Sequence, residues 1–225
     1  MRFLLLAGVL SLASYGLLVH PQSPASDAAP GAASPGGVTF EASGRPAPLA
    51  PRRLREGSFV DVRTQRYAVE GGTEEEILAS LRAGGNRTEG ETFFGLTVSE
   101  SSFQLQPRRQ SGGCVAEGVQ IETSITIHLP EWDAPSSASS ELRRDWTRFS
   151  TALERHEDHH REIAERGAQR TYESIRGLRR PTCEGVEFEA RTRSVRIANE
   201  TTAEHDRYDD QTEHGASQGA QWPVR

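Results

Sequence analysis

The chain has 225 residues and a formal net charge of −6, and all 26 of its basic residues are arginine. This acidic balance, with the arginines scattered among acidic residues, argues against nucleic acid as a partner. The glycine pairs at 84–85 and 112–113 are typical of turns, so the sequence offers no phosphate-binding loop.

The N-terminal segment has the composition of a secretory leader. After Met1, one arginine precedes an uncharged, leucine-rich run that continues to Val19, as in signal peptides. We predict a signal peptide over residues 1–25, cleaved after Ala25, and hence a secreted or periplasmic protein; an uncleaved membrane anchor is the alternative. Residues 26–57 are rich in Pro, Ala, Ser and Gly and are predicted to form a disordered linker.

A single folded domain is predicted over residues 58–219, with a short tail over 220–225. Alternating apolar residues predict one or two strands before Gly71. A capping box at Thr73–Glu76 then opens a short helix that stops at Gly84.

The clearest strand runs from Val119 to Leu129, where apolar and polar residues alternate. His128 falls on its polar face and is expected to be an exposed strand residue. Strands with a short helix, followed by helices, predict an α+β domain. We expect a small antiparallel sheet, then a long helix, then a second C-terminal helix or turn.

Two cysteines, Cys114 and Cys183, are far apart in the chain and belong to no C-x-x-C pair. In an oxidising compartment they can form one disulfide, which would stabilise the domain by a few kcal/mol. Two free buried thiols are the alternative, and zinc ligation by either cysteine is a weaker third one.

A long helix is predicted from Ser139 to about Leu178, with Ser140 or Ser139 as its cap and Pro181 just beyond its end. Its apolar residues recur three or four apart, and His156 and His160 continue the same stripe. Both imidazoles should therefore point inward, where an imidazole needs a hydrogen bond or a metal ion. The apolar members of the stripe near the histidines are Phe149, Leu153 and Ile163.

His156-Glu157-Asp158-His159-His160 fits the pattern H-E-x-x-H. Because positions i and i+4 of a helix share a face, His156 and His160 can both bind one Zn²⁺. Glu157 then lies close enough to take a proton from activated water. The alternative is a charged helix face on which two histidines happen to be stacked. His159 lies off the stripe and is expected at the surface or beside a ligand.

A third ligand must come from elsewhere, because a catalytic zinc site has three protein ligands and one open position. The longer metzincin pattern is excluded by Ile163 and Arg166. Residues 186–206 are predicted to form a second helix, although their Val, Thr and Ile also permit a strand. His214, in the glycine-flanked turn that follows, is the favoured ligand, and the alternatives are Glu184, Glu187 and Glu200.

The two motifs together resemble the bacterial domain of unknown function 922 family. The resemblance covers about residues 58–219 and is carried by His156-Glu157-x-x-His160, Tyr208-Asp209-x-x-Thr212-x-His214-Gly215, Leu129-Pro130-x-Trp132, Cys114 and Cys183. Members of this family are described as predicted secreted zinc-dependent proteases, so the resemblance implies a zincin-like peptidase. It places His156, Glu157, His160 and His214 at the metal and catalytic positions.

The predicted function is metal-assisted hydrolysis of a peptide or protein substrate. The predicted Zn²⁺ ligands are His156, His160 and His214. Glu157 is the candidate general base and the Tyr208 hydroxyl the candidate donor to the oxyanion. Asp209 would support a ligand imidazole, unless it and Tyr208 only fix the turn. The rival functions are a non-catalytic exported domain with a structural zinc site and an envelope-binding module; a membrane partner is expected only if the leader stays uncleaved.

Overall fold

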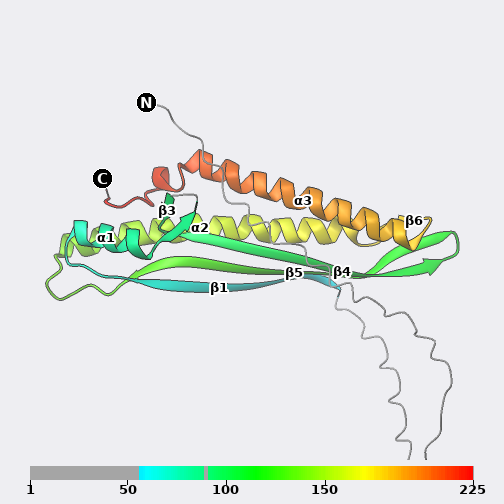
Figure 1. Ribbon diagram of the computed structural model, residues 1–225, viewed down its shortest axis with the longest axis horizontal. Coiled ribbons are helices and arrows are strands. Elements are labelled where there is room, and N and C mark those ends of the chain that lie inside the picture. The colour runs from blue at the N-terminus through cyan, green and yellow to red at the C-terminus, as the bar shows by residue number, and fades with distance from the viewer. Residues whose placement is uncertain (1–55, 89–90, 225) are drawn as a thin grey trace, which may run out of the picture. The chain divides into compact units, whose positions relative to one another are not determined.

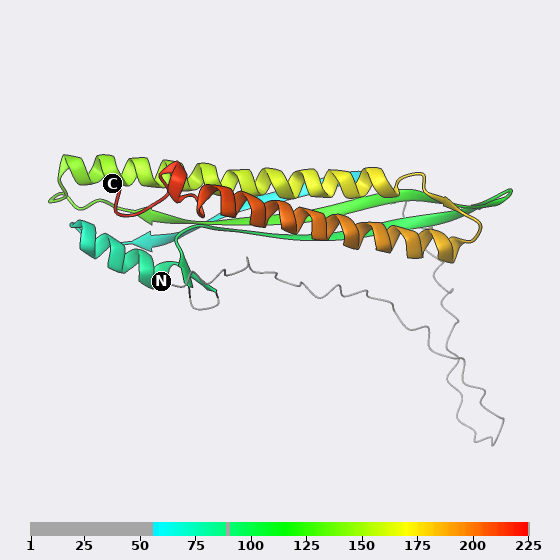
Figure 2. The same ribbon diagram turned by 90° about the horizontal axis from the view of Figure 1, so that it is seen from above.

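The computed structural model describes residues 56–88 and 91–224. The predicted leader and almost all of the predicted linker lie outside the described residues. The elements in chain order are β1 (Gly57–Val69), α1 (Glu74–Gly84), β2 (Asn86–Thr88), β3 (Glu91–Phe93), β4 (Leu96–Gln110), β5 (Gly113–Trp132), α2 (Ser140–Ile175), β6 (Arg179–Arg180), α3 (Cys183–Thr212) and the 3-10 turn η1 (Ala216–Gln218). The two long helices α2 and α3 lie over one face of the sheet (Figures 1 and 2). The expected α+β class, with its long helix and second C-terminal helix, is confirmed.

The sheet has the order β1-β5-β4, with β6 paired to the start of β5. β4 and β5 form an antiparallel hairpin, whereas β1 runs parallel to β5. The sheet is therefore mixed, and the prediction of an antiparallel sheet was wrong in this respect. β1 can pair in parallel with β5 because α1, β2, β3 and β4 lie between the two strands in the chain, and a parallel pair needs a long connection of this kind.

β5 is the central strand, and it fixes which sheet face is buried. Val119, Ile121 and Ile125 are at most 1% exposed, and they alternate with polar residues on the opposite face. His128 lies on that opposite face, as expected, and is half-buried. The helices therefore cover the apolar face of the sheet.

Helix α2 follows its predicted course. The Ser139 hydroxyl accepts a hydrogen bond from the Leu142 amide at 3.1 Å and caps the first turn. The apolar stripe faces the sheet, where Phe149 and Ile163 are at most 1% exposed. The two motif histidines lie on this stripe, so the helix carries them into the interior.

Helix α3 confirms the predicted second helix and is longer than expected at both ends. Thr182 caps its start, and the helix continues six residues beyond Asp206 to Thr212. Gly167 of α2 lets the two helices approach, since a Cβ there would lie 2.6 Å from the Thr201 hydroxyl oxygen. Tyr208 and Asp209 are consequently helical residues and do not belong to a turn.

A disulfide joins Cys114 in β5 to Cys183 at the first turn of α3. The predicted pairing is confirmed. It ties the N-terminal end of α3 to the sheet, at the opposite end of the helix from Asp209.

Replacing both cysteines by serine should lower the free energy of unfolding by about 4 kcal/mol, because the disulfide closes a loop of 69 residues and removes that closure entropy from the unfolded state. Denaturant unfolding of the Cys114→Ser/Cys183→Ser variant and of the oxidised protein measures the difference. Equal free energies of unfolding for the two proteins would show that the disulfide does not stabilise the fold.

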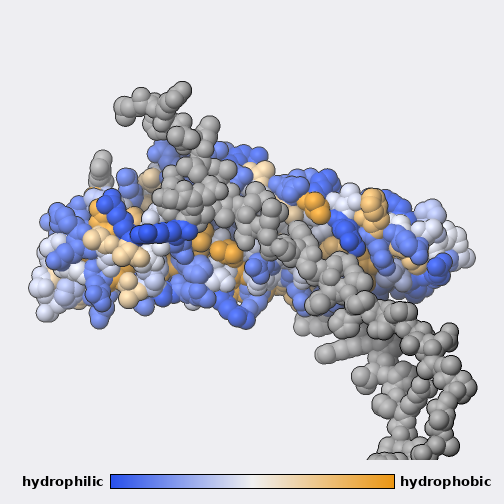
Figure 3. Space-filling view, viewed as in Figure 1, coloured by the Kyte–Doolittle hydropathy of each residue, from blue (hydrophilic) through white to orange (hydrophobic). Residues whose placement is uncertain are grey.

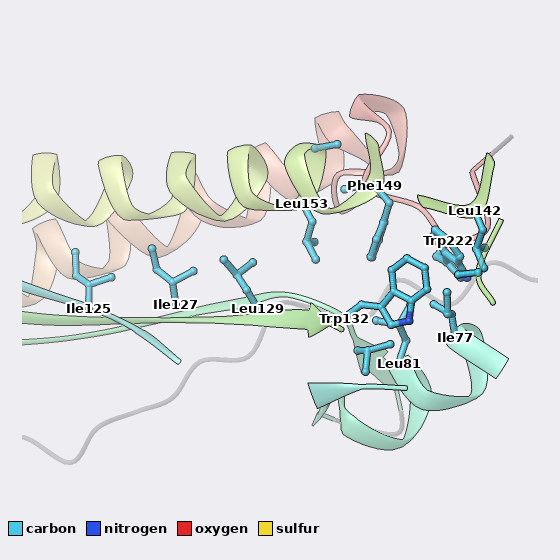
Figure 4. Packing of buried hydrophobic residues seen from close by; sticks show 14 of the residues in the cluster. Ile77, Leu81, Ile125, Ile127, Leu129, Trp132, Leu142, Phe149, Leu153 and Trp222 are labelled. Atoms are coloured by element: carbon cyan, nitrogen blue, oxygen red, sulfur yellow. The ribbon is translucent and has the colours of Figure 1, made fainter. Parts of the chain in front are cut away.

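The largest apolar cluster among the described residues lies where α1 meets the start of α2 and the end of β5 (Figure 4). The Trp132 indole donates to the Gly71 carbonyl at 2.9 Å, and the Trp222 indole donates to the Glu74 carbonyl at 3.1 Å. Ala220 and Trp222, at 9% and 4% exposed, lie in the segment predicted as a tail but belong to the core, and Trp222 joins this segment to α1.

The face shown in Figure 3 is mostly hydrophilic, and hydrophobic residues appear on it in small groups. In the described part of the chain, none of the helices combines the length and the apolar character needed to cross a membrane.

Candidate metal centre

The two long helices bring three ligand-type side chains together. His156 and His160 come from successive turns of α2, and Asp209 comes from the last turns of α3. The Nε2 atoms of the two histidines are 3.3 Å apart. Asp209 Oδ1 lies 3.2 Å from Nε2 of His156 and 3.0 Å from Nε2 of His160. Among the described residues, this is the one group of three or more His, Cys, Asp or Glu placed to hold a metal ion.

These distances fit a tetrahedral metal site. Zn²⁺ takes imidazole nitrogen and carboxylate oxygen at about 2.0–2.1 Å, which places neighbouring ligand atoms of a tetrahedron about 3.3–3.4 Å apart. The three separations are within a few tenths of an ångström of that spacing. Two imidazoles with one carboxylate is also a ligand set used by catalytic zinc.

The electrostatics of the group favour a positive charge at its centre. Burial alone would raise the pKa of Asp209, but hydrogen bonds from His156 and His160 hold it well below its usual range. Burial alone would lower the pKa of His156, but the hydrogen bond to Asp209 and the charge of Glu157 raise it. Asp209 is therefore a carboxylate at neutral pH, and the charge beside it can come from a proton or a metal ion.

His214, the ligand favoured from sequence, lies beside this group but is not part of it. Its Nδ1 atom is 3.8 Å from Asp209 Oδ1, and its side chain is 47% exposed. Glu213 and His214 both have φ of 52° and turn the chain out of α3. Gly215 then passes so close to His156 that a Cβ there would lie 3.0 Å from the ring. The group placed to hold a metal ion contains Asp209 and not His214, whereas the sequence argument favoured His214 as the third ligand.

The glutamates considered as alternative ligands lie far from the group. With a rise of about 1.5 Å per residue, Glu200 is roughly 13 Å before Asp209 along α3, and Glu184 and Glu187 are roughly 33–38 Å before it. Glu200 is instead paired with Arg196 at 2.6 Å.

Glu157 is buried beside the ligand group, with 4% of its surface exposed. The Thr97 hydroxyl, at the start of β4, donates to Glu157 Oε2 at 2.8 Å. Burial raises the pKa of Glu157, although His160, Thr97 and His156 each lower it in part. A carboxylate of raised pKa holds a proton more strongly, which suits a group that must accept one.

A glycine makes room for that carboxylate. Gly95, between β3 and β4, is buried, and a Cβ at this position would lie 2.5 Å from Glu157 Oε1 and 2.9 Å from Leu153 Cδ1. Neither Gly95 nor Thr97 stood out in the sequence, because their role depends on the sheet lying against α2.

Further side chains occupy the other ring nitrogens of the two ligand histidines. His160 Nδ1 is 2.8 Å from His205 Nδ1, and His156 Nδ1 is 3.1 Å from Gln218 Oε1. The sequence analysis missed both residues. His205 had a usable signal, because it precedes Asp209 by four residues on a helix and so shares its face.

Tyr208 and His159 lie at the edge of the site. The Tyr208 ring stacks on His156, with centroids 4.9 Å apart, and lies 4.2 Å from the His159 ring. The Tyr208 hydroxyl is hydrogen-bonded to the Gln218 side chain. The His159 side chain is 41% exposed, at the surface and beside the ligand group.

The fold and the site define an α+β protein whose two long helices present a two-histidine, one-carboxylate candidate metal centre. The chain belongs to the family described as bacterial protein of unknown function (DUF922), whose model matches residues 64–215. The resemblance inferred from sequence is thereby confirmed, and the match includes both motifs. No curated protein and no solved structure gives a significant match.

Proposed function

We propose that this chain is an exported zinc-dependent hydrolase that cleaves peptide bonds. One observation carries the proposal: three ligand atoms from two helices lie at tetrahedral spacing, beside a buried glutamate of raised pKa. The site's residues offer a candidate for each role that such hydrolysis requires. The resemblance to predicted secreted zinc-dependent proteases supports the choice of a peptide substrate.

When bound, Zn²⁺ supplies Lewis-acid chemistry that makes water acidic near neutral pH and polarises a carbonyl. His156, His160 and Asp209 are the residues that would hold it. Glu157 takes the proton of the attacking water and returns it to the leaving amine. Thr97 orients the Glu157 carboxylate for both transfers through its 2.8 Å hydrogen bond.

Tyr208 is the candidate for stabilising the oxyanion. Its ring lies against His156, and burial raises the pKa of its hydroxyl, so it remains a proton donor at neutral pH. Its hydroxyl is held by Gln218, and it must leave that partner to donate to a substrate.

A non-catalytic role is the second candidate, and the position of His214 favours it. With its Nδ1 3.8 Å from Asp209 Oδ1, His214 is near enough to become a fourth ligand after a small movement. Four protein ligands would make the site structural and leave no place for water.

Export is part of the proposal. The predicted leader over residues 1–25 supports it, and so does the disulfide, since such bonds persist in oxidising compartments. A mature protein that begins near Ser26 in its native host would support cleavage, and a retained Met1 in a membrane fraction would favour the anchor.

Metal content and metal-dependent cleavage test the function. The purified protein should contain one zinc ion per chain and should cleave members of a broad peptide library. A chelator should abolish this activity, and added Zn²⁺ should restore it. Bound zinc without cleavage of any library member would favour the structural site, and absence of zinc binding would overturn both candidates.

Replacing Gly95 by alanine should impair catalysis more than metal binding. The added methyl overlaps Glu157 Oε1, so the carboxylate must move away from its place beside the ligands. We expect a loss of stability of about 1–3 kcal/mol from overpacking and a fall in kcat of at least tenfold, with zinc retained. Gly72→Ala is the matched control, because a Cβ there makes only ordinary contacts, the nearest at 3.6 Å. Wild-type kcat in Gly95→Ala would show that the position of Glu157 is not constrained by β4.

A further inference from the structure

Both ligand imidazoles have their second ring nitrogen engaged by a side chain outside the ligand group. Gln218 Oε1 lies 3.1 Å from His156 Nδ1, and His205 Nδ1 lies 2.8 Å from His160 Nδ1. A neutral imidazole carries one proton and one lone pair, and a metal ion needs the lone pair. Which nitrogen holds the proton therefore decides whether the imidazole can bind metal through Nε2.

We propose that His205 and Gln218 are positioning residues that hold a proton on Nδ1 of His160 and of His156, so that the Nε2 lone pair of each ring is available to a metal ion placed between the two rings and Asp209. This inference rests on the proposed function. An amide oxygen can only accept, so Gln218 requires the Nδ1 proton of His156. His205 accepts from His160 through its own Nδ1 when its proton is on Nε2.

The fold places these residues by a simple repeat of spacing. His156 and His160 are four residues apart on α2, and His205 and Asp209 are four residues apart on α3. Each helix thus presents one pair of residues to the other helix. Three of these four residues are the proposed ligands, and the fourth, His205, contacts His160. The planes of the His205 and His160 rings are 26° apart and their centroids 5.1 Å apart, so the two rings meet through their Nδ1 edges.

The geometry distinguishes this role from direct ligation by His205. His205 Nδ1 lies against Nδ1 of His160, whereas Asp209 lies against Nε2 of the same ring. The two nitrogens are on different edges of the imidazole. His205 therefore approaches His160 from the side away from the ligand atoms.

Gln218 is held in its place by a second contact. Its side chain is hydrogen-bonded to the Tyr208 hydroxyl at 3.1 Å, and Tyr208 stacks on His156. The η1 turn that carries Gln218 is attached to the end of α3 by a hydrogen bond from the Ser217 hydroxyl to the Thr212 carbonyl at 3.0 Å. The last turns of the chain therefore act on His156, while α3 acts on His160.

The test compares His205→Ala, His205→Gln and Gln218→Ala in the full chain by Zn²⁺ competition with a chromophoric chelator. Loss of such supporting partners weakens metal binding by about 10–100-fold, and we expect this for both alanine variants. Glutamine at 205 retains an acceptor oxygen and should restore affinity to within about threefold of wild type. The absorption bands of the Co²⁺-loaded protein should change in His205→Ala and return in His205→Gln.

His128→Ala is the control, because it removes an imidazole from the outer face of β5 and should leave metal affinity unchanged. If His205→Ala does not fold when metal-free, His205→Gln and Gln218→Ala decide the question. Wild-type affinity in both alanine variants would overturn the inference and leave the proposed function standing, as would failure of glutamine to rescue position 205. Absence of Zn²⁺ and Co²⁺ binding by the wild-type protein would overturn both.

Discussion

Replacing Asp209 by alanine should weaken Zn²⁺ binding on the order of 10²–10³-fold. Zinc sites with four protein ligands bind with about 10–16 kcal/mol, or roughly 2.5–4 kcal/mol for each ligand. Asp209 Oδ1 lies within 3.2 Å of both ligand nitrogens, so its loss removes one full ligand. His214→Ala should change the affinity by less than about tenfold, because its side chain is half-exposed and lies outside the ligand group.

Chelator competition on the two variants, alongside Asp210→Ala, separates the assignments. Asp210 is the neighbouring exposed carboxylate on α3, so its removal controls for the change in net charge. If His214→Ala lost more affinity than Asp209→Ala, the C-terminal turn would supply the third ligand, and Asp209 would only support an imidazole.

The helix that carries the motif could be predicted because its determinants are local. Spacings of three and four residues placed His156 and His160 on the same stripe as Phe149 and Leu153, and all four are buried. Of the two serines considered as its cap, Ser139 is the one that caps the helix. The disulfide could be predicted from the presence of two cysteines and the expectation of export.

The place of Asp209 beside His156 and His160 could not be fixed from sequence, because the end of α3 has no strong local signal. Its middle contains β-branched residues, which lower helix preference. The helix ends at Thr212 and its C-cap is Glu213, a non-glycine residue with φ of 52°, whereas the sequence rules look for glycine at a helix end. The prediction ended the helix at Asp206, and this put Asp209 in a turn and made His214 the better-placed ligand.

The rest of the site depends on packing between distant segments. The parallel pairing of β1 with β5 has no sequence signature of its own, because the residues alternate in the same way in either direction. The contact of Thr97 with Glu157 joins residues 60 positions apart. It exists only because β4 lies under α2, which periodicity within each element cannot reveal.

Replacing Glu157 by glutamine should abolish hydrolysis while leaving the metal bound. Glutamine has nearly the same shape, and its amide oxygen can still accept the hydrogen bond that Thr97 donates to Oε2, but it cannot take a proton from water. Loss of a general base lowers kcat by about 10²–10⁴-fold. Because Glu157 is not one of the three ligands, the zinc content should stay at the wild-type level.

Glu154→Gln is the matched control, since Glu154 is an exposed glutamate one turn earlier on α2 whose nearest partner is Arg66 at 3.7 Å. It should leave both kcat and zinc content unchanged. The assay uses a library peptide that the wild-type protein cleaves, with zinc measured on the same samples. Undiminished cleavage by Glu157→Gln would remove Glu157 from the chemistry, because no amide side chain can act as the base. Loss of zinc together with activity would instead make Glu157 part of the metal-holding structure.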